Sequence, residues 1–221
     1  MLQRVICLPL AAALLCLYGA AHAREPAAGL VLVAARDTGG VFRESIVYLL
    51  SHDEHGSLGV IVNRPTKATL TDLLPKFAEL EARSHRILYG GPVGLRALKF
   101  LVRTHEHPGD AVRIDSDIFA SGSPELLETL LQADFDPAAL RVFVGYAGWA
   151  PDQLNQELAR TAWYVVQLTT EEIFTADEGL WKRLISTFDP PGIRTRMDTP
   201  LRAVWETGTA VPLPSSPSPP G

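Results

Sequence analysis

Three consecutive segments between residues 45 and 62 decide the expected fold: Ser45-Ile-Val-Tyr-Leu-Leu50, His52-Asp-Glu-His-Gly56 and Ser57-Leu-Gly-Val-Ile-Val62. The first and third are apolar and rich in residues that favour strands. The second is polar and ends in glycine, which is typical of a tight turn. Two strands joined by so short a turn form an antiparallel hairpin, so the sequence predicts a hairpin here.

Strands and helices are interspersed on both sides of this hairpin. The run Gly29-Leu-Val-Leu-Val-Ala-Ala35 predicts a buried strand upstream. Further strands are expected at residues 86–89, 99–102, 141–146 and 162–167, and helical segments at residues 69–77, 123–131, 151–160 and 170–185. The order has no regular βαβ rhythm, so the sequence favours an α+β fold over a doubly wound sheet. A chain of 221 residues is long enough for one sizeable core and short for two.

Two of the expected helices begin with recognisable capping residues. Thr69 is followed three residues later by Asp72, which is the spacing of a hydroxyl cap with an acidic partner. Ser123 is followed by Pro124, which suits the first turn of a helix because its missing N–H is not needed there.

The charge balance argues against direct contact with nucleic acid. The chain has 20 basic and 25 acidic residues, a formal charge of -5, and a pI of about 5.7. Binding to DNA by counterion release needs clustered Lys and Arg, whereas these residues are scattered here.

The first 23 residues have the pattern of a cleavable secretory signal. Arg4 precedes an apolar run that ends in Ala21-His22-Ala23. A membrane anchor is the alternative, but the run is barely long enough to span and contains Pro9. Cleavage removes both cysteines, Cys7 and Cys16, and leaves 19 basic and 25 acidic residues, a net charge of -6. We therefore expect a thiol-free periplasmic or secreted protein without a stable membrane anchor.

The opposite end of the chain has a different composition. Five prolines and three serines fall within residues 212–221. Such a segment buries too little apolar area to offset the entropy of ordering, so we expect disorder from about residue 212. The expected domain organisation is a signal at 1–23, one domain at 24–187 and a C-terminal extension at 188–221.

Two histidine patches are the places where metal-type ligands cluster: His52 with His55, and His105 with His107. Together they could hold zinc. Both patches fall in expected turns or loops, where polar residues are ordinary, and the solvated-loop interpretation is favoured. The sequence therefore predicts no metal. It contains neither a phosphate-binding glycine motif nor a serine-hydrolase elbow, so no cofactor is predicted and no catalytic residue is assigned.

A candidate ligand site is suggested by residues at expected strand ends: Asn63, Arg64, Gly90, Gly91 and Trp149. Arg64 offers a planar fork for a carboxylate or phosphate, the glycines permit close backbone approach, and Trp149 could cover an apolar group. Each has a structural alternative. Arg64 could bond carbonyls, the glycines could serve a turn with positive φ, and Trp149 could fill the core.

Taken together, these segments resemble the AlgH/YqgE family of bacterial proteins. Seven elements match in order over residues 27–187: Gly29-Leu-Val-Leu-Val-Ala, Val41-Phe-Arg-Glu-Ser45, Leu58-Gly-Val-Ile-Val-Asn-Arg-Pro65, Tyr89-Gly-Gly-Pro-Val93, Val144-Gly-Tyr-Ala-Gly-Trp149 with Gln153-Leu-Asn-Gln-Glu157, Trp163, and Ile173-Phe174. Each motif alone is weak, but the seven in this order and spacing are specific.

The resemblance implies a bifurcated mixed β-sheet curled into a pseudo-barrel with flanking helices. It implies no agreed biochemical activity, although founding members of the family are linked to transcriptional regulation of alginate production. Three departures stand out. Asp152 replaces a usual glycine, Thr38-Gly39-Gly40 replaces a usual Asp-Pro turn, and family members are usually cytoplasmic. An exported copy could not contact the chromosome, so the export signal and a role in transcription exclude each other.

Two functional hypotheses follow. The first is a non-enzymatic binding or regulatory domain that recognises a small molecule or a protein. The second is a metal-dependent hydrolase using His52, His55, His105 and His107. The absence of an evident nucleophile–base pair favours the first.

The signal assignment can be tested by expression from the protein's own start in a bacterial host. Because Ala21-His22-Ala23 suits signal peptidase, the product should be recovered outside the cytoplasm and begin at Arg24. Intact mass and N-terminal analysis of the periplasmic fraction measure this. A full-length soluble product in the cytoplasm would contradict the assignment.

Overall fold

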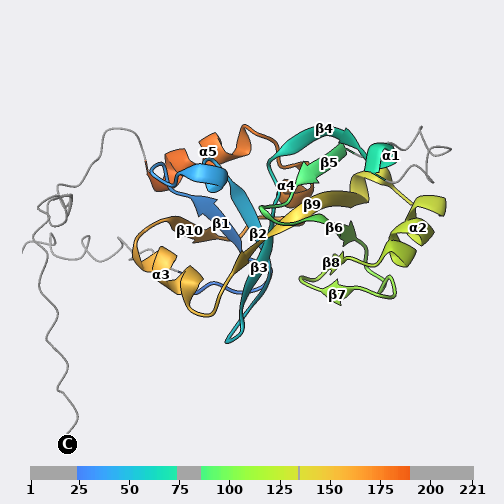
Figure 1. Ribbon diagram of the computed structural model, residues 1–221, viewed down its shortest axis with the longest axis horizontal. Coiled ribbons are helices and arrows are strands. Elements are labelled where there is room, and N and C mark those ends of the chain that lie inside the picture. The colour runs from blue at the N-terminus through green and yellow to red at the C-terminus, as the bar shows by residue number, and fades with distance from the viewer. Residues whose placement is uncertain (1–23, 74–85, 134, 190–221) are drawn as a thin grey trace, which may run out of the picture. The chain divides into compact units, whose positions relative to one another are not determined.

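The structure, a computed structural model, describes residues 24–73, 86–133 and 135–189 (Figure 1). All of these residues belong to the first of two units, Met1–Pro190. The expected signal, the proline-rich tail and the part of the first helix beyond residue 73 lie outside the described residues.

The predicted hairpin is confirmed. β2 (Ile46–Asp53) pairs antiparallel with β3 (Gly56–Ile61) across a turn at Glu54 and His55. β1 (Val31–Ala34) lies against β2, and β10 (Trp163–Val166) lies against β1, both antiparallel. The N-terminal strand and the last strand of the fold are therefore neighbours, although about 130 residues separate them.

Helices cover both faces of this part of the sheet, which explains its apolar strands. Val31 and Val33 pack in one cluster with α5 (Leu180–Phe188). Leu32 and Ala34, on the opposite face, pack in another with α3 (Gln153–Ala159). Because successive strand residues face opposite sides, a strand covered on both sides must be apolar throughout.

The middle of the chain forms the other part of the sheet. Its elements are β4 (Pro65–Thr69), α1 (Leu70–Leu73), β5 (Arg86–Tyr89), β6 (Val93–Arg103), β7 (Val112–Arg113), β8 (Ile118–Ser121) and α2 (Pro124–Gln132). β8 lies between β6 and β7, and β4 pairs with β5. Leu126 and Leu127 of α2 pack on this part, and the Ser123 hydroxyl accepts the Leu126 N–H as the sequence predicts.

One strand joins the two parts, and the sheet forks along it. β9 (Leu140–Trp149) pairs with β6 on one side. On its other side, residues 142–144 pair parallel with β5, and residues 147–149 pair antiparallel with β3. Two residues lie between these pairings, Gly145 and Tyr146, and the φ of Gly145 is 70°. The strand order along the main path is β10-β1-β2-β3-β9-β6-β8-β7.

At the fork, the backbone after β5 packs directly against the backbone of β9. A Cβ on Gly90 would lie 2.3 Å from the Gly145 carbonyl oxygen, and one on Gly91 would lie 2.2 Å from the Tyr146 carbonyl carbon. Gly91 also has a φ of 149°, which side chains disfavour. Glycines are therefore required where β5 separates from β9.

The fold is α+β with a bifurcated, curled mixed sheet that forms a half-barrel, as the resemblance implies. Several details differ from the sequence-based expectation. The helical segment expected at 170–185 is two helices, α4 (Thr170–Thr175) and α5, and β4, β7 and β8 were not anticipated. Short 3-10 helices lie at Gly40–Phe42 and Pro137–Ala139. None of the helices within the described ranges has both the length and the hydropathy of a membrane span.

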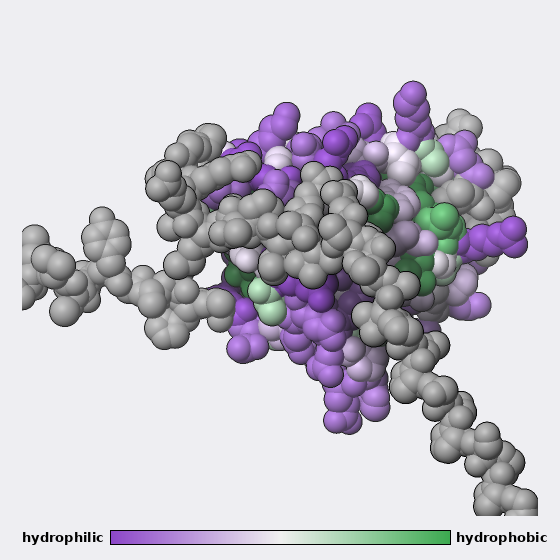
Figure 2. Space-filling model, turned by 60° about the vertical axis from the view of Figure 1, so that its left-hand side comes forward, coloured by the Kyte–Doolittle hydropathy of each residue, from purple (hydrophilic) through white to green (hydrophobic). Residues whose placement is uncertain are grey.

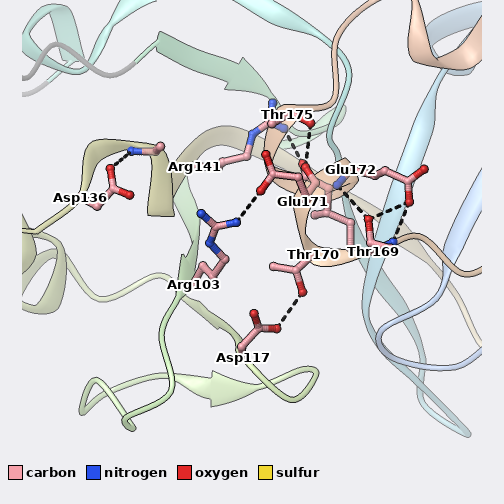
Figure 3. A network of polar contacts seen from close by, with 11 residues as sticks. Arg103, Asp117, Asp136, Arg141, Thr169, Thr170, Glu171, Glu172 and Thr175 are labelled. Atoms are coloured by element: carbon pink, nitrogen blue, oxygen red, sulfur yellow. Dashed lines mark hydrogen bonds and ion pairs between the residues drawn. The ribbon is translucent and has the colours of Figure 1, made fainter.

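α4 is tied to the forked sheet by Arg141, a half-buried arginine of β9 (Figure 3). The Arg141 guanidinium donates to the carbonyl oxygens of Ile173 and Ala176 at the end of α4, and to that of Val62 after β3. Burial lowers the Arg141 pKa to about 10, so the side chain remains charged at neutral pH. This one side chain links three segments that are distant in sequence.

Two further polar contacts support the same helix (Figure 3). Arg103 of β6 forms an ion pair with Glu171 at 2.7 Å, and the Thr170 hydroxyl donates to Asp117 at 2.7 Å. A capping box between Thr169 and Glu172 begins the helix.

The close packing at the fork predicts that any side chain at position 91 strongly destabilises the protein. Gly91→Ala should lower the free energy of unfolding by at least about 2 kcal/mol, because it combines disfavoured φ with overlap onto the Tyr146 backbone. Gly39→Ala is the matched control, since Gly39 has an ordinary φ and open space around it, and should change stability by less than about 0.5 kcal/mol. Urea unfolding of both variants measures the difference, and equal stabilities would refute the packing at the fork.

The family pattern has glycine at position 152, and we expect Asp152→Gly to stabilise the protein. Asp152 precedes α3 with a φ of 60° and makes no capping hydrogen bond with its side chain. Glycine adopts this conformation without steric cost, so Asp152→Gly should raise the free energy of unfolding by up to about 1 kcal/mol. Asp152→Val should lower it, because a β-branched residue fits the left-handed region poorly. Thermal unfolding of the pair tests this, and a stabilising valine would be inconsistent with it.

Candidate functional site

The loop between β1 and β2 is held in a strained conformation. Glu44, two residues before the start of β2, has a φ of 58°. Non-glycine residues in this region cost on the order of 1 kcal/mol or more and persist only where the surroundings fix them. Ser45, the next residue, is fully buried. The side chains that fix this loop lie just after β3, at the end of the hairpin opposite its turn.

Asn63 is the first of them. Its Oδ1 accepts the Ile46 N–H at 2.8 Å, and its Nδ2 donates to the Glu44 carbonyl at 2.9 Å. The residue is only 4% exposed. One amide group thus bonds the backbone on both sides of Ser45.

Arg64 is the second. One terminal nitrogen donates to the Val41 carbonyl, and the other to the Arg43 carbonyl at 2.8 Å and the Ser45 hydroxyl at 2.9 Å. The guanidinium also lies 5.8 Å from the centre of the Tyr89 ring. Arg64 and Asn63 together bond five residues between positions 41 and 46, and we call this arrangement the loop clamp.

An open polar cavity of about 390 Å³ lies beside the loop clamp, and we call it the Arg64 cavity. Its lining residues are Gly40, Arg43, Glu44, Asn63, Arg64, Glu178 and Lys182. Four of them place side-chain charges there that make no hydrogen bond or ion pair with the rest of the described chain: Arg43, Glu44, Glu178 and Lys182. Positive and negative groups are therefore available at one cavity.

The two predicted glycines, Gly90 and Gly91, do not line this cavity. Gly90 accepts the Ile61 N–H and donates to the Val144 carbonyl, and both Gly90 and Gly91 are buried at the fork. They reach the loop clamp through Tyr89, whose N–H donates to the Arg64 carbonyl at 2.9 Å.

Trp149, the fifth predicted residue, lies on the other side of the loop. It is 4% exposed and stacks on Phe42, with ring centroids 5.9 Å apart. Phe42 also meets Trp163 edge to face. Both indole N–H groups donate to one carboxylate oxygen of Glu157, at 2.9 and 2.8 Å. The loop is thus anchored by its carbonyls on one side and by Phe42 on the other.

The structure brings together Asn63 and Arg64 at a cavity, and it separates them from Trp149. The ligand-binding role assigned to the five residues remains a prediction. Sequence analysis missed Glu178 and Lys182, which reach this cavity from a segment more than 110 residues away. It also missed Glu157, although the spacing of Gln153 and Glu157 on one helix face was available as a signal.

The two histidine patches occupy separate surface positions. His52 Nδ1 lies 2.7 Å from the Ser57 Oγ across the hairpin, and His55 is exposed at the turn. The hairpin tip projects from the domain and is hydrophilic (Figure 2). His105 and His107 are exposed in the loop after β6. Within residues 24–73, 86–133 and 135–189, no group of three or more His, Cys, Asp or Glu side chains is arranged to hold a metal ion.

Known proteins are similar to this chain in sequence and in fold. A UPF0301 protein of Nocardia farcinica is 38% identical over 165 residues, covering 70% of this chain and 74% of its own. A UPF0301 protein of Rhodococcus opacus is 31% identical over 196 residues, covering 75% and 90%. The solution structure of the AlgH protein from Pseudomonas aeruginosa superposes with a TM-score of 0.62 at 23% identity, covering 73% of this chain and 88% of that chain.

A crystal structure of a Corynebacterium diphtheriae protein gives a TM-score of 0.60 at 22% identity, covering 74% and 88%. At these identities the two solved structures establish the fold alone. Residues 31–191 match the model of a family described as AlgH-like. This match covers most of the chain and agrees with the motifs at the fork and the loop clamp, so the chain belongs to the AlgH-like family.

Proposed function

We propose that the protein is a non-catalytic binding protein whose Arg64 cavity takes a small zwitterionic ligand, one with an acidic and a basic group close together. The family is uncharacterised, so the proposal is argued from the site. The observation that carries it is the strained loop at Glu44, which the loop clamp holds against an open cavity with uncommitted charges. Backbone strain maintained by dedicated side chains is a feature of binding sites.

The charges at the cavity define the ligand chemistry. Arg43 and Lys182 can bind a carboxylate or phosphate, and the Arg64 Nε–H has no hydrogen-bond partner within the described chain. Glu44 and Glu178 can bind an ammonium group. A purely anionic ligand would meet two like charges, and a purely cationic ligand would meet three. The volume of about 390 Å³ lies within the range of small-molecule sites.

A catalytic role receives less support from the geometry. The Ser57–His52 hydrogen bond resembles a nucleophile and its base. Ser57 is only 8% exposed, and it lies in β3 between β2 and β9. No carboxylate among the described residues bonds His52. The metal-hydrolase alternative would need His52, His55, His105 and His107 at one centre, and the described chain offers no such cluster.

Binding can be measured by thermal shift and ligand-observed NMR with a panel of free amino acids and related zwitterions. Arg43→Gln and Glu178→Gln should each weaken binding by about tenfold or more, because each removes a charge-assisted hydrogen bond. Both side chains are exposed and have no partner among the described residues, so the melting temperature without ligand should hardly change. Arg64→Ala is unsuitable for this purpose, since it removes the bonds of Arg64 to the loop and should cost about 1–3 kcal/mol of stability.

Arg160→Gln provides the matched control, because Arg160 is exposed at the end of α3 and does not line the cavity. It should leave binding unchanged. The proposal fails if no zwitterion binds, or if binding is indifferent to both cavity variants. Binding that purely anionic analogues reproduce would reject the zwitterion class.

A further inference from the structure

Three strands of the described chain pair with a single neighbour and so form edges of the sheet: β4, β7 and β10. Natural sheets protect such edges with charges, proline or very short strands. β4 contains Pro65 and Lys67, and β7 has only two residues, one of them Arg113. β10 has none of these protections, since its sequence is Trp-Tyr-Val-Val and its pairing with β1 is regular. β10 is therefore the unprotected edge.

The hydrogen bonds of β1 show which backbone groups of β10 are free. The Ala34 N–H donates to the Ser45 carbonyl, and the Leu49 N–H donates to the Leu30 carbonyl. Even-numbered residues of β1 therefore turn their backbone groups toward β2. Because strand residues alternate, the odd-numbered ones turn toward β10.

The same alternation applies along β10. The Ala35 N–H donates to the Ala162 carbonyl, and Tyr164 follows in the same orientation toward β1. Trp163 and Val165 lie between these positions, so their N–H and C=O groups turn away from β1. No hydrogen bond within the described chain uses these four backbone groups. They form two donor–acceptor pairs at the spacing of a strand.

These groups face a groove of about 560 Å³, which we call the β10 edge groove. Leu158 and Ala159 of α3 wall one side, and Phe188 at the end of α5 walls the other. Phe188 is 41% exposed and stacks on Tyr164, with ring centroids 5.6 Å apart. The edge strand thus lies at the base of a largely apolar channel.

We propose that the β10 edge groove binds an extended, uncharged peptide segment of a partner protein by strand addition. The backbone groups of Trp163 and Val165 pair with the added strand. Alternate side chains of the peptide then point toward Leu158 and Ala159 of α3 and toward Phe188, which are apolar. Asn155 is the polar residue of α3 that lines the groove. Among the described residues, the charged side chains that line the groove are Arg24 and Glu25, whose opposite charges cancel, so a neutral and largely apolar segment fits it best. This site is separate from the Arg64 cavity, and the two proposals can fail independently.

The free edge is tested first by amide hydrogen exchange of the purified protein. The amides of Trp163 and Val165 should exchange fast, whereas those of Tyr164 and Val166 should be protected by their bonds to β1. Protected Trp163 and Val165 amides in the free protein would overturn the proposal, because the edge would already be covered. If that protection increased with protein concentration, a second copy would be the occupant.

Peptide binding is tested with a displayed library of linear peptides, followed by titration of a selected soluble peptide. Val165→Pro should weaken binding by about tenfold or more, because it replaces an outward donor with a ring on the edge. It should leave the fold intact, because that N–H is not part of the sheet ladder. Tyr164→Pro is the control for orientation and should lower the melting temperature, since its N–H bonds β1.

Strand addition predicts that the bound peptide slows exchange at Trp163 and Val165, and that Val165→Pro abolishes this effect. A library that yields no binder would refute the proposal. So would a peptide that binds Val165→Pro as tightly as the unmodified protein. A stable Tyr164→Pro variant would show that the backbone orientation is reversed.

Discussion

The close approach of two backbones at the fork of β9 is the constraint on which the other features depend. With Gly90 and Gly91 against Gly145 and Tyr146, β5 can leave β9 where β3 joins it. Any side chain there would separate the strands. The same junction positions Tyr89 so that its N–H donates to the Arg64 carbonyl. This bond fixes the point at which the chain leaves β3. The fork therefore positions the loop clamp.

The loop clamp in turn fixes the conformation of the strained loop before β2. Neutral and charged donors, from Asn63 and Arg64, satisfy carbonyls that a loop of this kind would otherwise expose to water. Phe42 secures the opposite side by packing on Trp149 and Trp163. The carboxylate of Glu157 accepts from both indoles, which orients α3 against the same cluster. One wall of the β10 edge groove is the exposed side of α3, so the two proposed binding sites share a rigid support.

Polar groups in the interior are used here mainly to join segments. Arg141 bonds three carbonyls and no carboxylate of the described residues, which is tolerable because both terminal nitrogens donate to carbonyl oxygens. Arg64 is used in the same way at the surface of the domain. Around the Arg64 cavity, by contrast, Arg43, Glu44, Glu178 and Lys182 are exposed and bond no other described residue through their charged groups, and solvation makes these charges inexpensive until a ligand arrives.

The sequence by itself determined the local elements: the hairpin at residues 46–61, the start of α2 at Ser123 and the strand before Gly90. Hydrophobic period, turn glycines and capping residues act over a few positions, so they can be identified without a fold. It also indicated Asn63 and Arg64, because they follow a strand. Only the tertiary structure decided what these residues contact. Lys182 lines one cavity with Arg64, and β10 pairs with β1, across more than a hundred residues in each case. Such arrangements depend on which strands meet at the fork, which no local pattern records.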